Sequence, residues 1–191
     1  MIDMRLIIID GLDGVGKDTQ AILIKKRYEK MGDKVLIRSH PESDNFFGKK
    51  AKKALLKSGK INKTRAAIYY MLDVLRSIRK YYRRKDIDTL IVVRYLVGTA
   101  YLPKRLAKYA YRFFLGFVPT SKYMFFLDVP PEIVLERISD RKEKEIFETH
   151  EALVNVRKKA LKLVKNWIII DASNSIENTF SKIELELKAI D

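Results

Sequence analysis

A glycine-rich segment near the start of the chain has the residue types and spacing of a phosphate-binding loop. Residues 11–18 read Gly-Leu-Asp-Gly-Val-Gly-Lys-Asp, which fits glycine, four residues, glycine and lysine, with aspartate where serine or threonine is usual. Glycines allow backbone angles that a Cβ atom would block, so the loop can turn its amide groups toward a polyphosphate. Lys17 is placed to reach the outer phosphates as a point charge. The pattern predicts a nucleoside polyphosphate as ligand.

The residues on either side of this loop predict the two elements that such a loop requires. Residues 6–9 before it are apolar and predict a buried strand, and residues 17–31 after it have a helix pattern. The amino end of that helix adds the positive end of its dipole to the phosphate site. The alternative is a glycine-rich turn in another kind of α/β protein, and we reject it because both required neighbours are present.

Strands and helices are expected to alternate along the whole chain. Short apolar runs predict strands at 4–10, 34–38, 89–94, 123–129 and 167–171. Helices are expected at 17–31, 46–58, 63–84, 98–116, 131–140, 148–165 and 176–189. Strands that are apolar throughout are typical of a parallel sheet buried between helices. Because no repeat or linker divides the sequence, we expect one α/β domain over residues 1–191.

The composition limits the classes of protein to which the chain can belong. It contains no cysteine, which excludes disulfides and thiolate metal sites and favours a cytoplasmic location. We expect no signal peptide, and no apolar stretch approaches the roughly 20 residues that a membrane span needs. The formal net charge is +15, with basic residues spread along the chain. We favour a lysine-rich surface or attraction of small anions over nucleic-acid binding as the explanation.

Four further motifs follow the glycine-rich loop in an order found in a known family. They are His40-Pro41-Glu42 after the second expected strand, Arg94-Tyr95 at the end of the third, residues 126–129 followed by Glu136, Arg137 and Arg141, and residues 170–173 before the last helix. Together with residues 11–20 they resemble the thymidylate kinase family of nucleoside monophosphate kinases. The resemblance covers nearly the whole chain.

The resemblance implies a P-loop kinase fold, with a five-stranded parallel sheet, helices on both faces and a short lid at about 139–147. It also implies transfer of the γ-phosphoryl group of ATP, with Mg²⁺, to a (deoxy)nucleoside monophosphate. The first expectation is dTMP, which would give dTDP. Because members of the family commonly form dimers, a homodimer is expected here too.

The same resemblance assigns roles to individual residues. ATP would be held by Gly11, Asp13, Gly14, Val15, Gly16, Lys17, Asp18 and Thr19. The acceptor would be bound by Asp13 at the sugar, Pro41 and Glu42 in the following loop, Tyr70 at the base and Arg94 at the phosphate. Catalysis would rest on Lys17, Arg94, Arg137 and Arg141. Because Gly14 stands where some members carry an arginine, the lid is expected to supply the arginine that neutralises the phosphates. A core role for Tyr70 is the alternative to base stacking.

Several positions depart from the family pattern on the metal and acceptor sides. Asp18 stands where a hydroxyl normally binds Mg²⁺, and we predict that its carboxylate is a direct ligand. Val93 replaces an aspartate that organises the metal waters. Val74 and Gly98 replace polar residues near the base, and Ser43 stands where a basic residue is common. These changes leave open the accepted base, and a nucleotide-binding protein with decayed kinase activity is the alternative function.

Two cationic segments could bind a partner other than a nucleotide, or could have a structural role alone. Residues 76–85 interleave charge with aromatic side chains, as the surface of a nucleic-acid-dependent ATPase does, but a cation-rich helix end is favoured. Residues 101–118 are basic and aromatic, which is compatible with binding to a membrane surface. We favour a helix that packs against the sheet or a second subunit.

Overall fold

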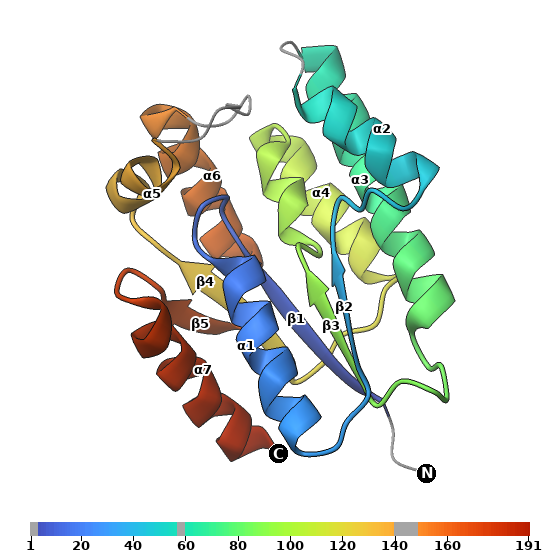
Figure 1. The fold of residues 1–191 in the computed structure, drawn as a ribbon. Coiled ribbons are helices and arrows are strands. Elements are labelled where there is room, and N and C mark those ends of the chain that lie inside the picture. The colour runs from blue at the N-terminus through green and yellow to red at the C-terminus, as the bar shows by residue number, and fades with distance from the viewer. Residues whose placement is uncertain (1–3, 57–59, 140–148) are drawn as a thin grey trace.

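A computed structural model describes residues 4–56, 60–139 and 149–191 and shows a sheet between two layers of helices (Figure 1). The sheet is parallel and has the strand order β2-β3-β1-β4-β5. The strands are β1 (Arg5–Gly11), β2 (Val35–Ser39), β3 (Thr89–Val93), β4 (Tyr123–Asp128) and β5 (Ile168–Asp171). The predicted five-stranded parallel sheet is confirmed, and every strand boundary lies within one residue of its predicted position.

The three central strands, β1, β3 and β4, are buried from both sides because they are apolar almost throughout. Ile8 and Ile9 of β1 and residues 90–93 of β3 are 0% exposed. Ile9 pairs in register with Val93 of β3 and with Phe125 of β4, so the three central strands end at one edge of the sheet. The loops that leave the carboxyl ends of parallel strands are where ligands bind in open α/β sheets.

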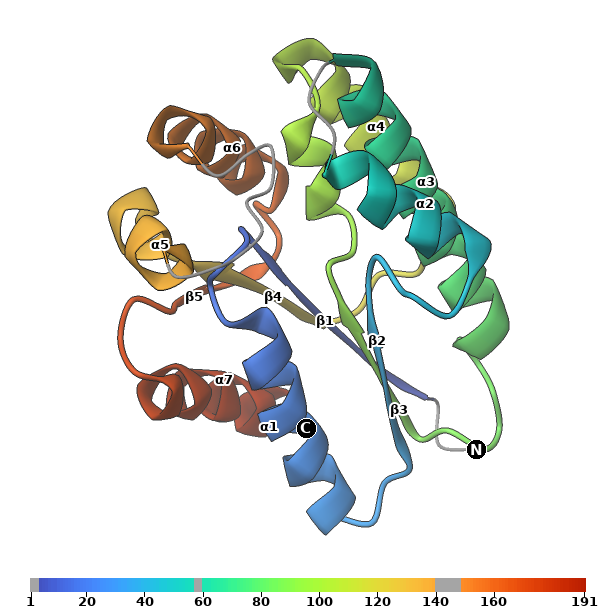
Figure 2. The same cartoon turned by 45° about the horizontal axis from the view of Figure 1, so that its top comes forward.

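Helices cover both faces of the sheet, as predicted, and Figure 2 shows the two layers from the side. One face carries α1 (Lys17–Lys30) and α7 (Ile176–Ile190). The other face carries α3 (Lys60–Tyr81), α4 (Lys104–Leu115) and α6 (His150–Leu163), with α2 (Phe46–Leu55) against α3 and α5 (Pro131–Ile138) against α6.

The helix predicted over residues 98–116 is wrong as a single element. The structure divides it into a 3₁₀ helix, η1 (Val97–Tyr101), and α4, which begins directly after Pro103. Proline lacks an N–H and disfavours helical backbone at the preceding residue, and Leu102 is extended, with ψ of 160°. The break lets Gly98 and Tyr101 of η1 line the cleft beside the glycine-rich loop.

Other helix ends differ from the prediction by a few residues. α3 spans residues 60–81 rather than 63–84, and α5 ends at Ile138. Residues 57 and 58 of the second predicted helix and residues 140–147 of the predicted lid lie outside the described residues. Among the helices that the structure describes, none is both long and apolar enough to span a membrane.

Candidate active site

The glycine-rich loop joins the carboxyl end of β1 to the amino end of α1 (Figure 1). Gly14 has a φ of +83°, and a Cβ atom there would lie 2.6 Å from Cγ2 of Ile138. A side chain, including the arginine of some family members, would therefore strain the backbone and collide with α5. Val15 is buried within the loop, whereas Thr19 is exposed in the first turn of α1.

The amino end of α1 has no side-chain cap. Its N-cap residue is Gly16, with φ of +90°, whereas α2, α6 and α7 are capped by the side chains of Asn45, Thr149 and Ser175. The first N–H groups of a helix have no partner within the helix, and the helix dipole favours negative charge near them. The start of α1 therefore has the features of an anion-binding site.

Lys17 is held inside the loop by backbone carbonyl groups. Its side chain is buried, and its ammonium donates hydrogen bonds to the carbonyl oxygens of Gly11, at 2.9 Å, and Leu12. The Asp13 carboxylate lies 3.7 Å from the ammonium. Burial, helped by the nearby Arg94 cation, lowers the pKa of Lys17 to about 8. The loop thus fixes a cation beside the anion site.

Arg94 connects this loop with the ends of two strands. It follows β3, has a φ of +60°, and its guanidinium lies 3.5 Å from the Asp13 carboxylate and 3.1 Å from that of Asp18. The same guanidinium donates to the Ser39 hydroxyl at 3.1 Å, and that hydroxyl donates to Asp18 at 2.5 Å. Predicted residues from two separate segments, the loop and Arg94, therefore meet in one cluster with Ser39, which was not predicted.

The charges in this cluster keep both carboxylates ionised. Burial alone would raise the pKa of Asp13, but Lys17 and Arg94 outweigh it and lower the pKa. Arg94, with a hydrogen bond from Ser39, likewise outweighs burial at Asp18 and lowers its pKa. The two carboxylates in turn raise the pKa of Arg94. A phosphate that binds here meets an arginine that is already charged.

Asp10 is a positioning residue that the sequence patterns did not indicate. Its buried carboxylate accepts backbone hydrogen bonds from Gly11 at 2.9 Å, Tyr95 at 2.7 Å and Val97 at 3.0 Å. These bonds hold the loop after β1 and the segment that follows Arg94 in one arrangement. The only sequence signal is an acidic residue at the end of an otherwise apolar strand.

A cleft of about 630 Å³ lies beside the cluster, and it brings all five predicted acceptor residues together. Its lining includes Asp13, Pro41, Glu42, Tyr70 and Arg94, together with Asp18. The cleft also contains Lys52 and Tyr101, which were not predicted. The hydroxyl of Tyr101 donates to the Asp13 carboxylate at 3.0 Å, and the ammonium of Lys52 donates to the Ser43 hydroxyl at 2.6 Å.

Tyr70 forms one wall of this cleft. Its side chain is buried, and its hydroxyl donates to the carbonyl oxygen of Tyr95 at 3.2 Å. The ring lies so close to Gly98 that a Cβ atom there would be 2.6 Å from Cε1 of the tyrosine. Gly98 is therefore explained as the residue that leaves room for the Tyr70 ring. Base stacking by Tyr70 stays a prediction.

The loop before α2 is braced by Asp73 of α3. This buried carboxylate accepts hydrogen bonds from the backbone N–H of Glu42 at 2.7 Å and from the Asn45 amide at 2.6 Å. The Glu42 carboxylate accepts from the Ser39 backbone N–H at 2.9 Å, which keeps it within its own loop. The contact of Glu42 with an acceptor stays a prediction.

The two arginines predicted near the lid differ in what the structure shows of them. Arg137 donates hydrogen bonds to the carbonyl oxygens of Ala172 and Ser173 at 3.0 Å and of Asn174 at 3.1 Å, in the loop between β5 and α7. It thus fixes that loop, and its catalytic role stays a prediction. Arg141 lies outside the described residues.

The described residues contain no group of three or more His, Asp or Glu side chains that could hold a metal ion. Asp18 is the carboxylate that fits a bound Mg²⁺ with phosphate oxygens as further ligands. Its side chain is 53% exposed at the mouth of the anion site, whereas Asp10 is buried and already bonded to backbone N–H groups. The role of Asp18 as a metal ligand stays a prediction.

Comparison with known proteins agrees with this arrangement. The family model described as thymidylate kinase matches residues 9–183. A probable thymidylate kinase from Saccharolobus solfataricus is 29% identical and covers 88% of this chain and 89% of its own length. A thymidylate kinase from Thermosipho africanus is 27% identical, with 93% of this chain and 94% of its own length covered.

A solved structure adds evidence on the fold. Thymidylate kinase from Candida albicans matches with a TM-score of 0.73 at 18% identity, covering 98% of this chain and 92% of its own. At that identity the likeness speaks for the fold alone, and it confirms the predicted kinase fold. Since the family model spans most of the sequence, the chain belongs to the thymidylate kinase family of nucleoside monophosphate kinases.

Proposed function

We propose that residues 1–191 form one kinase domain that transfers the γ-phosphoryl group of ATP to dTMP, giving dTDP and ADP. The observation that carries this proposal is the cluster of Asp13, Asp18 and Arg94, which lies between the uncapped start of α1 and the acceptor cleft. Phosphoryl transfer depends on alignment and positive charge rather than on covalent help from the protein. The cluster is placed to provide both.

On the donor side, the loop and the start of α1 hold the phosphates of ATP. The loop amides and the first N–H groups of α1 bind phosphate oxygens, and Lys17 turns from the carbonyls of Gly11 and Leu12 toward the outer phosphates. Asp18 supplies a carboxylate oxygen to Mg²⁺, which neutralises phosphate charge when bound. Its ionised, half-exposed side chain supports this role.

On the acceptor side, two cations contact the phosphate of the monophosphate. Arg94 is one, but it is shared with Asp13 and Asp18. Lys52 is the second, because it lines the cleft and its ammonium donates to the neutral Ser43 hydroxyl. Ser43 occupies a position where the family commonly has a basic residue, so Lys52 supplies from α2 the charge that residue 43 lacks.

The sugar and the base occupy the remainder of the cleft. Asp13, held by the Tyr101 hydroxyl, accepts a hydrogen bond from the sugar hydroxyl. The Tyr70 ring stacks on the base, with Gly98 on the other side of the ring. Val74 is fully buried and brings no polar group to the base, so the shape of the cleft and stacking contribute more to base selection than hydrogen bonds do.

A homodimer and a cytoplasmic location complete the proposal. Exposed apolar residues on α3, Ile61, Ile68 and Leu72, follow a helical spacing and support self-association through that helix. The partner in catalysis remains the small nucleotide, with no role for nucleic acid or a membrane.

Release of ADP with a panel of monophosphates tests the function. Purified protein, ATP and Mg²⁺ are incubated with dTMP, dUMP, dCMP, dAMP or dGMP, and nucleotide products are separated by chromatography. We expect dTMP to give the highest turnover, with dTDP and ADP in equal amounts. Tight ATP binding without turnover of any monophosphate would overturn the proposal in favour of a nucleotide-binding protein without kinase activity.

A further inference from the structure

A second concave surface lies between α4 and α6, on the face of the sheet opposite α1 and α7 (Figure 2). The groove has a volume of about 1120 Å³, and none of its lining residues lines the acceptor cleft. It extends to residues 120–121 before β4 and 165–167 before β5, at the amino ends of the strands. The catalytic cluster lies at their carboxyl ends. The groove is therefore separate from the active site.

The floor of this α4–α6 groove is apolar and fixed in place. Tyr111 of α4 and Trp167 are both buried, and the indole N–H donates to the Tyr111 hydroxyl at 3.0 Å. Ala107, Met124 and Leu163 complete the floor.

The rims of the groove are cationic. Lys108 and Arg112 of α4 and Lys158 and Lys162 of α6 are four residues apart in each helix, so each pair projects from one side of its helix. Lys165 and Lys159 also line the groove, and the Lys159 ammonium donates to the carbonyl oxygen of Leu102 at 2.8 Å. Apart from Lys159, the five cationic side chains are exposed and have no ion-pair partner within the described chain, and no described Asp or Glu lines the groove. Like charges placed so close together repel one another unless an anion lies between them.

Another cation of α6, Arg157, does have an ion-pair partner within the chain. Its guanidinium forms two hydrogen bonds of 2.7 Å with the Asp128 carboxylate. The helix thus directs one cation to an internal partner and presents Lys158 and Lys162 along the groove. The groove cations are therefore available to an external anion.

An apolar floor between two rows of cations is the complement of an amphipathic helix with carboxylates beside its apolar stripe. We propose that the α4–α6 groove binds an acidic amphipathic helix of a partner protein. A flat bilayer fits the concave surface poorly, and binding of a nucleic acid is one of the outcomes that the test below separates. A second copy of the chain would bring a further net charge of +15 to the basic rims.

Binding of a synthetic peptide to the full-length protein tests this proposal. The probe is a fluorescent helical peptide of about 18 residues, long enough for helix formation, with leucines on one face and glutamates beside them. A scrambled peptide of the same composition keeps the charge but lacks the stripe. We expect saturable binding of the helical peptide, at least about tenfold weaker binding of the scrambled one, and weaker binding at higher salt.

The matched protein variants are Lys158→Glu/Lys162→Glu in the groove and Lys26→Glu/Lys30→Glu on α1. Both change the net charge by the same amount and at exposed lysines, so only the groove variant should lose at least about tenfold in peptide affinity. Kinase activity of both variants should match the parent protein, which reports an intact fold. Equal loss in the two variants would overturn the proposal. So would equal binding of the two peptides, or groove-dependent binding of single-stranded DNA or phosphatidylserine vesicles but not of the peptide.

Discussion

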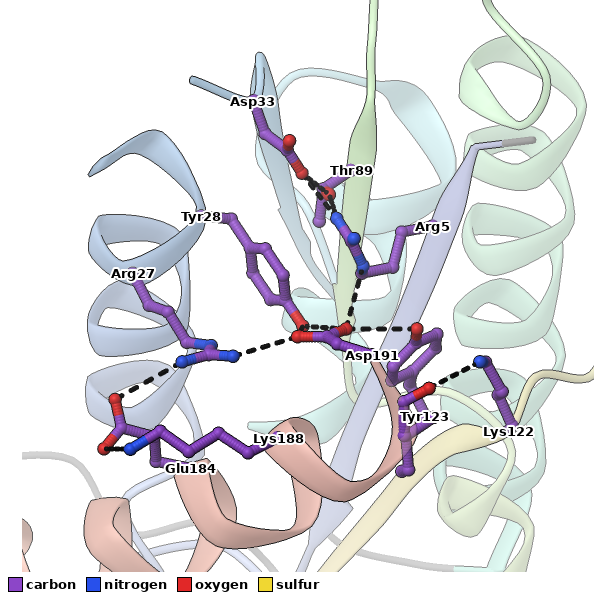
Figure 3. Close-up of polar contacts among 11 residues, drawn as sticks. Arg5, Arg27, Tyr28, Asp33, Thr89, Lys122, Tyr123, Glu184, Lys188 and Asp191 are labelled. Atoms are coloured by element: carbon purple, nitrogen blue, oxygen red, sulfur yellow. Dashed lines mark hydrogen bonds and ion pairs between the residues drawn. The ribbon is translucent and has the colours of Figure 1, made fainter. Parts of the chain in front are cut away.

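Two clusters of arginine and aspartate lie at opposite ends of the central sheet and differ in how far their carboxylates are exposed to solvent. At the amino ends of the strands, the Asp191 carboxylate accepts from Arg27 at 2.9 Å, Tyr28 at 3.0 Å and Tyr123 at 3.2 Å (Figure 3). Arg5 lies 3.5 Å from the same carboxylate and donates to Asp33 at 2.5 Å. This cluster ties α7 to α1, β1 and β4.

The cluster at the carboxyl ends of the strands is more exposed to solvent. The Asp18 side chain is 53% exposed, against 18% for Asp191, and a single arginine serves both Asp13 and Asp18. That arginine, Arg94, has the positive φ that non-glycine residues rarely adopt and that is often found at functional sites. Arginine and aspartate side chains thus stabilise the fold where they are shielded from solvent, and they can exchange partners with a ligand where they are exposed.

The largest expected effect is on catalysis, from the change Arg94→Ala. Removal of one preorganised cation from a phosphate site should lower kcat/KM for dTMP by about 10²–10³-fold. Steady-state kinetics check this, and Arg94→Lys should recover part of the activity because it restores the charge without the planar fork. Arg5→Ala is the matched control and should leave kcat/KM within about twofold of the parent. A similar loss of activity in both alanine variants would contradict the comparison.

The change Asp191→Ala is expected to act on stability instead. It removes a carboxylate that accepts hydrogen bonds from Arg27, Tyr28 and Tyr123, so the free energy of unfolding should fall by about 2–3 kcal/mol. Urea denaturation measures this, and kcat at a temperature where both proteins are folded should be unchanged.

The pH dependence of stability tests whether the negative charge of Asp191 is what stabilises the fold. Burial alone would raise the pKa of Asp191, but Arg27, Tyr28 and Arg5 outweigh it and lower the pKa. A lowered folded-state pKa stabilises the fold above the unfolded pKa of about 3.9, and this stabilisation is lost as the pH falls further. The difference between parent and Asp191→Asn should therefore be full at pH 7 and shrink below about pH 4. A difference that does not change with pH would exclude the charge as its cause.

A smaller effect is expected from Lys52→Ala in the acceptor cleft. Loss of one cation beside the acceptor phosphate should raise KM for dTMP by about tenfold while kcat and the affinity for ATP stay near those of the parent. Lys53→Ala, an exposed lysine one position along α2, is the control. Equal KM values for the two variants would remove Lys52 from the acceptor site.

The smallest expected effect concerns the metal. In Asp18→Ser the carboxylate that would otherwise repel the ATP phosphates is absent, so ATP affinity should depend less on Mg²⁺, by about threefold to tenfold. Titration of ATP with and without Mg²⁺ in both proteins measures the ratio. An unchanged ratio would show that Asp18 is not a metal ligand.

The strands and the glycine-rich loop could be predicted from the sequence because local residue types determine them. Contacts between distant segments could not. Asp10 acts on the backbone of residues 95 and 97, and Lys52 reaches Ser43 only after α2 folds back over the cleft. Pro103 marks the start of α4 in the sequence, but the apolar and aromatic residues around it favoured the prediction of one long helix. Arg137 was placed correctly on α5, and only the fold shows that it bonds the loop after β5.

Calorimetric titration of ATP–Mg²⁺ into the purified protein shows whether the glycine-rich loop holds the phosphates of ATP. Lys17→Ala is the comparison protein. Lys17 lies among the loop carbonyls at the uncapped start of α1, so the parent should bind one ATP per chain and the variant should bind at least about tenfold more weakly. No heat of binding with the parent, or the same affinity in the two proteins, would contradict the assignment of this loop as the site of the ATP phosphates.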